Sequence, residues 1–240
     1  MNLYVKTFAF VLMLSVFIWS RTPRTHRGFY FSFGAGPSYS SAEISGKYDD
    51  RYYGENPRYI DVKVSENIRF SGEPFPAFDI RFGKSFWNLM VLYSEIDLSL
   101  QTGTLELTRK IWSTEEVSAL IAKERFEDKE AFGGRATAGL GFAFYPFLRP
   151  DSPLRGLHVG QSVSFGGNYY QSKKFRDRIK LYSAELFNSF EVGMDWWTSD
   201  AWSIGTEFSY RFAVTFWELP SDFDEGKGNV ISLKLRITRG

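Results

Sequence analysis

Residues 182–212 read YSAELFNSFEVGMDWWTSDAWSIGTEFSYRF, and this stretch decides the fold. Large apolar side chains alternate with small or charged ones on both sides of Thr198, Ser199 and Asp200. A period of two is the signature of a β-strand, and short polar segments between two such runs form turns. The stretch therefore predicts a β-hairpin with one large apolar face and one face of small and ionised groups.

Such a hairpin fits two kinds of protein. A soluble β-sandwich buries its apolar face, whereas a transmembrane barrel turns that face to lipid and its polar face inward. Aromatic residues make up 18% of the 240 residues and there are 21 glycines, a composition that suits strands between lipid and a crowded lumen. The net charge of +1 gives no global basic field, so nothing indicates nucleic acid. The absence of Cys excludes disulfide scaffolds, cysteine nucleophiles and thiolate metal sites.

The first 20 residues indicate that the protein is exported. Lys6 precedes an apolar run over residues 8–19, which has the length of a signal-peptide core and is short for a spanning helix. We expect a signal peptide over residues 1–20, a short periplasmic segment over 21–27 and a barrel domain over 28–240. An uncleaved anchor helix is the alternative. Export without further apolar helices leaves a soluble exported protein or an outer-membrane barrel.

Eight stretches show strand periodicity. They are residues 28–40, 74–83, 89–100, 131–146, 156–169, the two arms of the hairpin, and 229–238. Residues 41–74 lack periodicity and are predicted to form a long loop. Residues 101–130 form a second insertion, which the sequence Ser113-Thr114-Glu115-Glu116 predicts as a short amphipathic helix or, alternatively, as strands extended beyond the membrane. A basic loop over 171–180 and a loop with an acidic tip over 213–228 complete the series.

Long and short connections alternate along this series. Transmembrane barrels have this asymmetry, with short periplasmic turns and long outer loops. Tryptophans at the short turns are predicted to form a periplasmic aromatic girdle: Trp87, Trp196, Trp197 and Trp202. The predicted fold is all-β, an eight-stranded antiparallel up-and-down transmembrane β-barrel with short periplasmic turns and long extracellular loops.

This pattern resembles the small OmpA/OmpX-type outer-membrane β-barrels over residues 28–240. The resemblance implies localisation in the bacterial outer membrane, a monomer, and contact with outer-membrane lipids, lipopolysaccharide and the barrel-assembly machinery. The end of the chain, Ile237-Thr238-Arg239-Gly240, departs from the family, whose barrels usually end in an aromatic residue.

Charged residues on the inward faces are predicted to form a structural network that plugs the lumen. Eight strands leave an interior just wide enough to be filled by side chains, and buried charges must be paired. The network comprises Asp79, Arg81, Glu95, Asp97, Arg135, Glu185, Glu191, Glu207, Arg211, Lys234 and Arg236. Arg135 is expected beside Glu95 and Asp97. Lys234 and Arg236 are expected to reach Glu207.

Three functions are compatible with this pattern. The first is a non-catalytic outer-membrane protein with a structural or surface-interaction role, whose long loops contact an extracellular ligand. The second is a narrow porin-like conduit for small solutes. The third is an enzyme that modifies outer-membrane lipid through His158, a strand serine such as Ser162 and a carboxylate. An interior histidine with its hydrogen bonds satisfied is the preferred interpretation of His158. Phosphate-binding loops and metal-ligand spacings are absent from the sequence, so no cofactor is expected.

Overall fold

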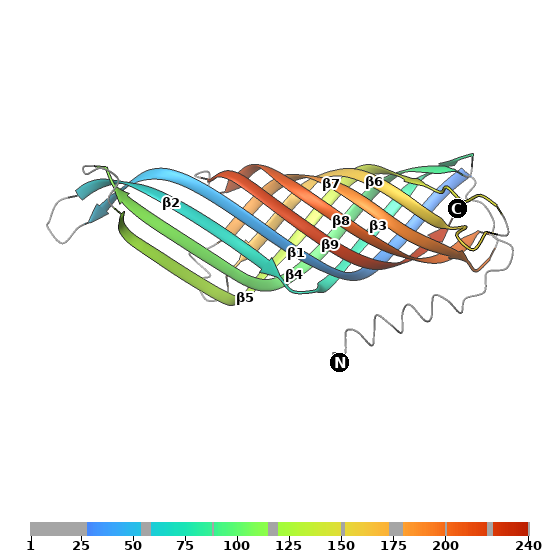
Figure 1. Ribbon diagram of the computed structural model, residues 1–240, viewed down its shortest axis with the longest axis horizontal. Helices are drawn as coiled ribbons and strands as arrows, with labels where there is room; N and C mark the ends of the chain where they lie inside the picture. The colour runs from blue at the N-terminus through green and yellow to red at the C-terminus, as the bar shows by residue number, and fades with distance from the viewer. Residues whose placement is uncertain are drawn as a thin grey trace.

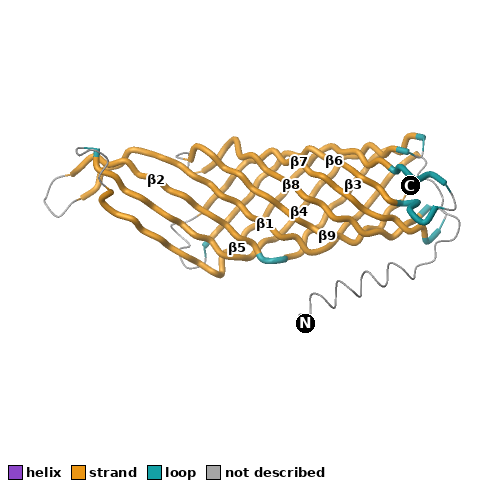
Figure 2. The backbone as a smooth tube through the Cα atoms, viewed as in Figure 1, coloured by secondary structure: helices purple, strands orange, loops and turns teal. Residues whose placement is uncertain are grey.

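The computed structural model describes residues 28–53, 59–87, 89–114, 120–149, 152–172, 180–199, 201–219 and 223–239. The signal peptide and the segment predicted over residues 1–27 lie outside these ranges, as do residues 173–179 of the basic loop. Strands make up most of the described chain, and turns gather at the end where the C-terminus lies (Figure 2). Within these ranges we find no helix with the length and hydropathy of a membrane span.

Nine antiparallel strands wind around one axis (Figure 1). Their bounds are β1 Gly28–Tyr53, β2 Tyr59–Gly72, β3 Phe75–Phe86, β4 Met90–Ser113, β5 Leu120–Phe144, β6 Leu157–Gln171, β7 Lys180–Trp197, β8 Trp202–Leu219 and β9 Phe223–Arg239. Strand β9 pairs with β1 and closes the ring. Closure pairs the strands on both sides in the part of the wall that faces lipid, which is the requirement for crossing hydrocarbon.

The nine strands fill eight positions of the barrel wall. Strand β3 pairs with the first part of β1 and the first part of β4, while β2 pairs with the later parts of the same two strands. Strands β2 and β3 therefore lie end to end, separated by Glu73 and Pro74. Proline has no amide hydrogen for the ladder, which accounts for the break. The predicted eight-stranded, up-and-down topology is confirmed.

The prediction of a long loop over residues 41–74 is wrong. Strand β1 continues to Tyr53 and β2 returns from Tyr59 in register with it. For residues 101–130 the extended-strand alternative is confirmed, because β4 runs to Ser113 and β5 begins at Leu120. Together these parts form a four-stranded sheet in the order β1, β2, β4, β5, which we call the extension. It projects beyond the barrel in Figure 1.

The two faces of the wall exchange polarity where the extension begins. Below this level on β4, Ile96, Leu98 and Leu100 face outward and are half exposed. Above it the outward residues as far as Lys110 are polar, and Leu105 and Leu107 turn apolar side chains inward, where they are buried. The same inversion follows Tyr39 on β1. The lower part thus has an apolar exterior and a polar interior, the distribution of a transmembrane β-barrel, while the extension has the distribution of a sheet in water.

The extension has its own core over the mouth of the barrel. The cluster comprises Ala42, Ile44, Ile68, Phe70, Leu105, Leu107, Ala131, Tyr170 and Leu181. Tyr170 and Leu181 come from the ends of β6 and β7, and the rings of Phe70 and Tyr170 lie 4.5 Å apart. The cluster therefore ties the extension to the opposite wall of the barrel and covers the lumen with apolar side chains.

A polar cluster lies farther out on the inward face of the extension. The Tyr48 hydroxyl donates to Glu66 at 3.0 Å, and Arg109 Nε donates to the same carboxylate at 2.5 Å. Burial, together with the negative charge of Glu66, raises the pKa of Tyr48 to about 12. Tyr48 therefore remains protonated, and a hydrogen-bond donor, throughout the physiological range.

We predict that Phe70→Ala destabilises the extension and leaves the barrel folded. Removing this 1%-exposed ring opens a cavity in the apolar cluster, which typically costs about 3–5 kcal/mol. Hydrogen exchange should accelerate in β2 and in the later part of β4, with β8 unchanged. The lipid-facing Phe82→Ala, 46% exposed, is the control and should leave the extension protected. Uniform acceleration in all strands would contradict a separately stabilised extension.

Candidate functional site: the charged interior of the barrel

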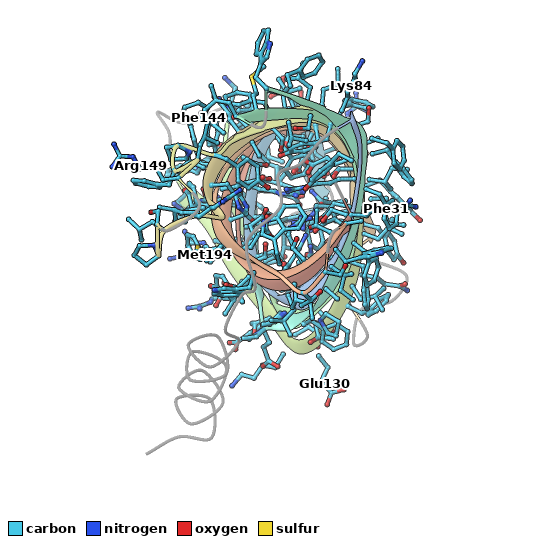
Figure 3. All side chains as sticks on the ribbon, turned by 90° about the vertical axis from the view of Figure 1, so that its right-hand side faces the viewer. Phe31, Lys84, Glu130, Phe144, Arg149 and Met194 are labelled. Carbon is cyan, nitrogen blue, oxygen red and sulfur yellow. The ribbon has the colours of Figure 1, made fainter. Side chains whose placement is uncertain are left out.

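Nitrogen and oxygen atoms crowd the interior when the barrel is viewed from its short-turn end, while Phe31 and Phe144 project outward (Figure 3). All eleven residues predicted for the network are placed in the interior, each 5% exposed or less. They come from every strand of the lower barrel except β1 and β6. These residues face the interior because side chains alternate along a strand, so each of them lies between two neighbours that face lipid.

Arg81 of β3 lies at the centre of the network. Its guanidinium donates to Glu191 at 2.6 Å and to Glu207 at 2.9 Å, from β7 and β8. It also lies 3.4 Å from Glu95 and 4.5 Å above the ring of Tyr93. Since β3 is far from β7 and β8 around the ring, the side chain of Arg81 spans the lumen.

A second group of ion pairs centres on Asp79 and Asp97. These two carboxylates are directly opposite in the β3–β4 register, an arrangement that is repulsive when uncompensated. Lys234 Nζ from β9 lies 2.6 Å from each and neutralises the repulsion. Asp97 also accepts from Arg135 at 3.1 Å, and Asp79 accepts from Arg236 at 2.5 Å. A like-charge cross-strand pair is therefore stabilised by an opposite charge placed between its members.

Two of the four predicted pairings inside the lumen are present, and no ion pair between Arg135 and Glu95 is found within the described chain. Arg135 pairs with Asp97, and Arg236 Nε lies 3.0 Å from Glu207. Lys234 differs from the prediction, because its partners are Asp79 and Asp97 rather than Glu207. Adjacency of strands suggested Glu207 as its neighbour, but the long lysine side chain reaches past β1 to the carboxylates of β3 and β4.

Two groups of interior residues were not recognised from the sequence. Asp195 is 2% exposed and accepts a hydrogen bond from the Tyr145 hydroxyl at 2.9 Å. Tyr93 donates to Glu191 at 2.8 Å. Continuing the alternation of the hairpin one step beyond Gly193 would have identified Asp195 as inward. The same alternation places Tyr93 on the inward face of its strand, but the predicted network comprised charged residues alone, so its hydrogen bond to Glu191 was not predicted.

His158 lies inside the barrel at the short-turn end and is 3% exposed. Its ring is 3.5 Å from Asp195 on one nitrogen and 3.5 Å from Glu207 on the other. Nδ1 is 3.2 Å from the carbonyl oxygen of Gly156. Ser162 donates instead to Glu95 at 2.9 Å. The histidine is enclosed by acceptors, and the serine is engaged by a carboxylate other than those beside His158.

Little space remains between these side chains. A cavity of about 10 Å³ lies in the upper lumen, lined in part by Arg135, Asn168 and Glu185. This volume accommodates about one water molecule. The Nη1 atom of Arg135 and the Oδ1 atom of Asn168 have no hydrogen-bond partner within the described chain. No cluster of described side chains has the composition of a metal site.

The predicted tryptophan girdle is only partly a surface feature. Trp87 is 82% exposed and Trp202 is 40% exposed, both at short turns. Trp196 is partly buried. Trp197 is 5% exposed and its side chain belongs to the interior, which corrects its assignment to the girdle. Adjacent residues on a strand point to opposite faces, so Trp196 and Trp197 cannot both face the membrane interface.

Comparison with known proteins finds likeness in structure alone. No family model and no curated protein matches the sequence. Outer membrane protein OprG from Pseudomonas aeruginosa is 10% identical, with 90% of this chain and 97% of OprG covered and a TM-score of 0.42. Ail, the attachment invasion locus protein of Yersinia pestis, is 12% identical, with 88% and 99% covered and a TM-score of 0.39. The outer membrane protease OmpT from Escherichia coli is 7% identical, with 91% and 98% covered and a TM-score of 0.37.

We predict that Arg81→Met strongly destabilises the barrel. The substitution keeps most of the volume but leaves Glu191 and Glu207 without their central cation, and breaking a buried ion pair in this way costs about 3–5 kcal/mol. Urea unfolding in lipid vesicles measures the change. The control is Arg125→Met, whose pairing with Glu106 is exposed and should contribute about 1 kcal/mol or less. Equal effects of the two substitutions would contradict the central role of Arg81.

Proposed function

We propose that this protein is a non-catalytic, integral outer-membrane β-barrel with a closed lumen, and that its role is surface interaction through the extension. The observation that carries the proposal is the side chain of Arg81, which joins β3 to β7 and β8 across the full width of the interior. A channel needs a continuous aqueous path, and this ion-pair network occupies it.

A second closure lies above the first. The apolar cluster of the extension covers the mouth, with Phe70, Leu105 and Leu181 each 2% exposed or less. Hydrated solutes would have to pass both an apolar layer and a paired charge network. The two closures act in series, which supports a structural role for the eleven network residues over a conduit.

The part of the chain available to partners is then the extension. Its outward face is mainly polar, with Trp112 and Ile121 as apolar exceptions near the tip, and its strands rise above the lipid-facing band. We place it on the extracellular side, because transmembrane barrels have short turns on the periplasmic side and long connections outside. Lipopolysaccharide is the first material that such a surface meets, and extracellular ligands are the second.

The geometry around His158 supports the absence of catalysis. A lipid substrate must reach the reacting group from the bilayer, yet His158 is enclosed within the wall by Tyr145, Asp195 and Glu207. We expect no lipid A deacylation by the purified barrel and no difference between it and His158→Ala. Measurable activity that is lost in His158→Ala would establish the enzymatic alternative.

We predict that planar bilayers containing the protein show no sustained open-channel current. Phe70→Ala alone should also remain closed, because the ion-pair network below is intact. The double variant Phe70→Ala/Arg81→Ala removes a component of each closure and should conduct intermittently. Heat-modifiable migration on gels verifies that each variant is folded. A steady current from the unmodified protein would establish the conduit instead.

A further inference from the structure

Four lysines occupy neighbouring outward positions on the extension. They are Lys47 on β1, Lys63 on β2, Lys110 on β4 and Lys123 on β5, all exposed, and we call them the lysine band. Lys110 and Lys123 are directly opposite in the β4–β5 register. Ser65 is directly opposite both Lys47 and Lys110, so one row across the sheet reads Lys47, Ser65, Lys110, Lys123.

This row is electrostatically unfavourable as it stands. Like charges directly opposite on an antiparallel pair destabilise a sheet. None of the four lysines forms an ion pair with another described residue. Asp49 is the acidic residue nearest to them in the register of the described strands, directly opposite Lys63. Inside the lumen the comparable pair of Asp79 and Asp97 has Lys234 between its members. The lysine band lacks such an internal counter-ion among the residues described.

The rows next to the band are compensated. Closer to the membrane, Arg69 lies 3.3 Å from Glu43, and Arg125 lies 3.2 Å from Glu106. Farther out, Arg51 lies 3.5 Å from Asp61. The uncompensated positive charge is therefore concentrated in the row of Lys47, Lys110 and Lys123, whereas Lys63 lies one row farther out and opposite Asp49. A charge concentrated in this way is the arrangement expected where an external anion supplies the missing charge.

The position of the band indicates the source of that anion. On β1 the polar face begins at Ser41, and Lys47 follows six residues later. At about 3.3 Å per residue and the strand tilt of such barrels, the band lies roughly 15 Å above the lipid-facing surface. Because it faces sideways, in continuity with the lipid-facing wall, it meets the headgroups of neighbouring lipids rather than a partner that approaches from above.

We propose that the lysine band binds phosphate groups on the core sugars of the glycolipid that surrounds the barrel in the outer leaflet. The ammonium groups of Lys47, Lys110 and Lys123 supply the charge, and the hydroxyl of Ser65 between them supplies a hydrogen-bond donor. Binding relieves the repulsion between Lys110 and Lys123 and anchors the extension to the sugar layer. The proposal rests on the extracellular placement of the extension in the proposed function.

The test compares lipopolysaccharide binding to matched lysine variants of the full chain. Lys110→Gln/Lys123→Gln removes two charges from the band, while Lys129→Gln/Lys227→Gln removes two lysines that pair with Glu127 and Glu43. Purified protein in detergent is titrated with lipopolysaccharide whose core is phosphorylated, and with lipopolysaccharide that lacks the core phosphates but retains lipid A. Native mass spectrometry counts the bound molecules.

We expect the band variant to bind phosphorylated lipopolysaccharide about tenfold more weakly and the control variant to change less than about twofold. The unmodified protein should show the same loss when the core phosphates are absent. Equal binding by all variants, or binding that ignores the core phosphates, would overturn the proposal. A second result would also overturn the proposal. If the barrel sits in vesicles that already contain phosphorylated lipopolysaccharide and its lysines still bind soluble dextran sulfate, the band is not occupied by lipopolysaccharide.

A third substitution separates binding from stability. Lys110→Glu places opposite charges across the β4–β5 register, so the thermal stability of the extension should stay the same or rise while lipopolysaccharide binding falls. A band with only a structural role would lose stability and keep its binding.

Labelling distinguishes this proposal from the proposed function. The sequence contains no Cys, so Asp61→Cys, at an exposed position farther out than the band, gives a single thiol for a membrane-impermeant maleimide on intact cells. Labelling that requires permeabilised cells would contradict the extracellular placement itself. Labelling of intact cells without lysine-dependent lipopolysaccharide binding would overturn the lysine band alone.

Discussion

Every backbone amide and carbonyl in hydrocarbon needs a partner within the protein, and the structure depends on this constraint. Strand β9 closes on β1, so the wall has no free edge in the region that faces lipid. Closure with eight strand positions makes a narrow interior, and every second residue must enter it. The identity of those residues then decides whether the lumen is filled, charged or open.

Charge pairing is the main consequence of that narrow interior. Arg81 and Lys234 reach carboxylates on strands that are not their neighbours, and Arg81 also lies 3.4 Å from Glu95 on the adjacent strand β4. Each cation then joins strands that are distant around the ring, so the network stabilises the closed wall as well as occupying its centre. The apolar cluster around Phe70 adds a separate layer above it, where the surroundings change from lipid to water.

The extension shows how one set of strands serves two solvents. Strand β4 presents Leu98 and Leu100 to lipid, then Glu106 and Lys110 to water, and its register with β5 shifts between Gly103 and Leu105, where the extension begins. Alternation keeps the inward and outward positions of β4 constant, so the composition of each of its faces has to invert. This inversion marks the membrane boundary, and the lysines of the outward face lie beyond it.

Alternation in the sequence determined the fold class, the eight positions of the wall and the inward location of all eleven network residues, because the side-chain direction of a strand is a local property. The sequence predicts a loop over residues 41–74 because the polar residues around Val62 and Val64 obscure the alternation of β2. The partners of Lys234 and the closure by Phe70 were decided only by the tertiary structure. Strand tilt and ring closure bring these residues together, and such distances across the lumen leave no trace in local sequence.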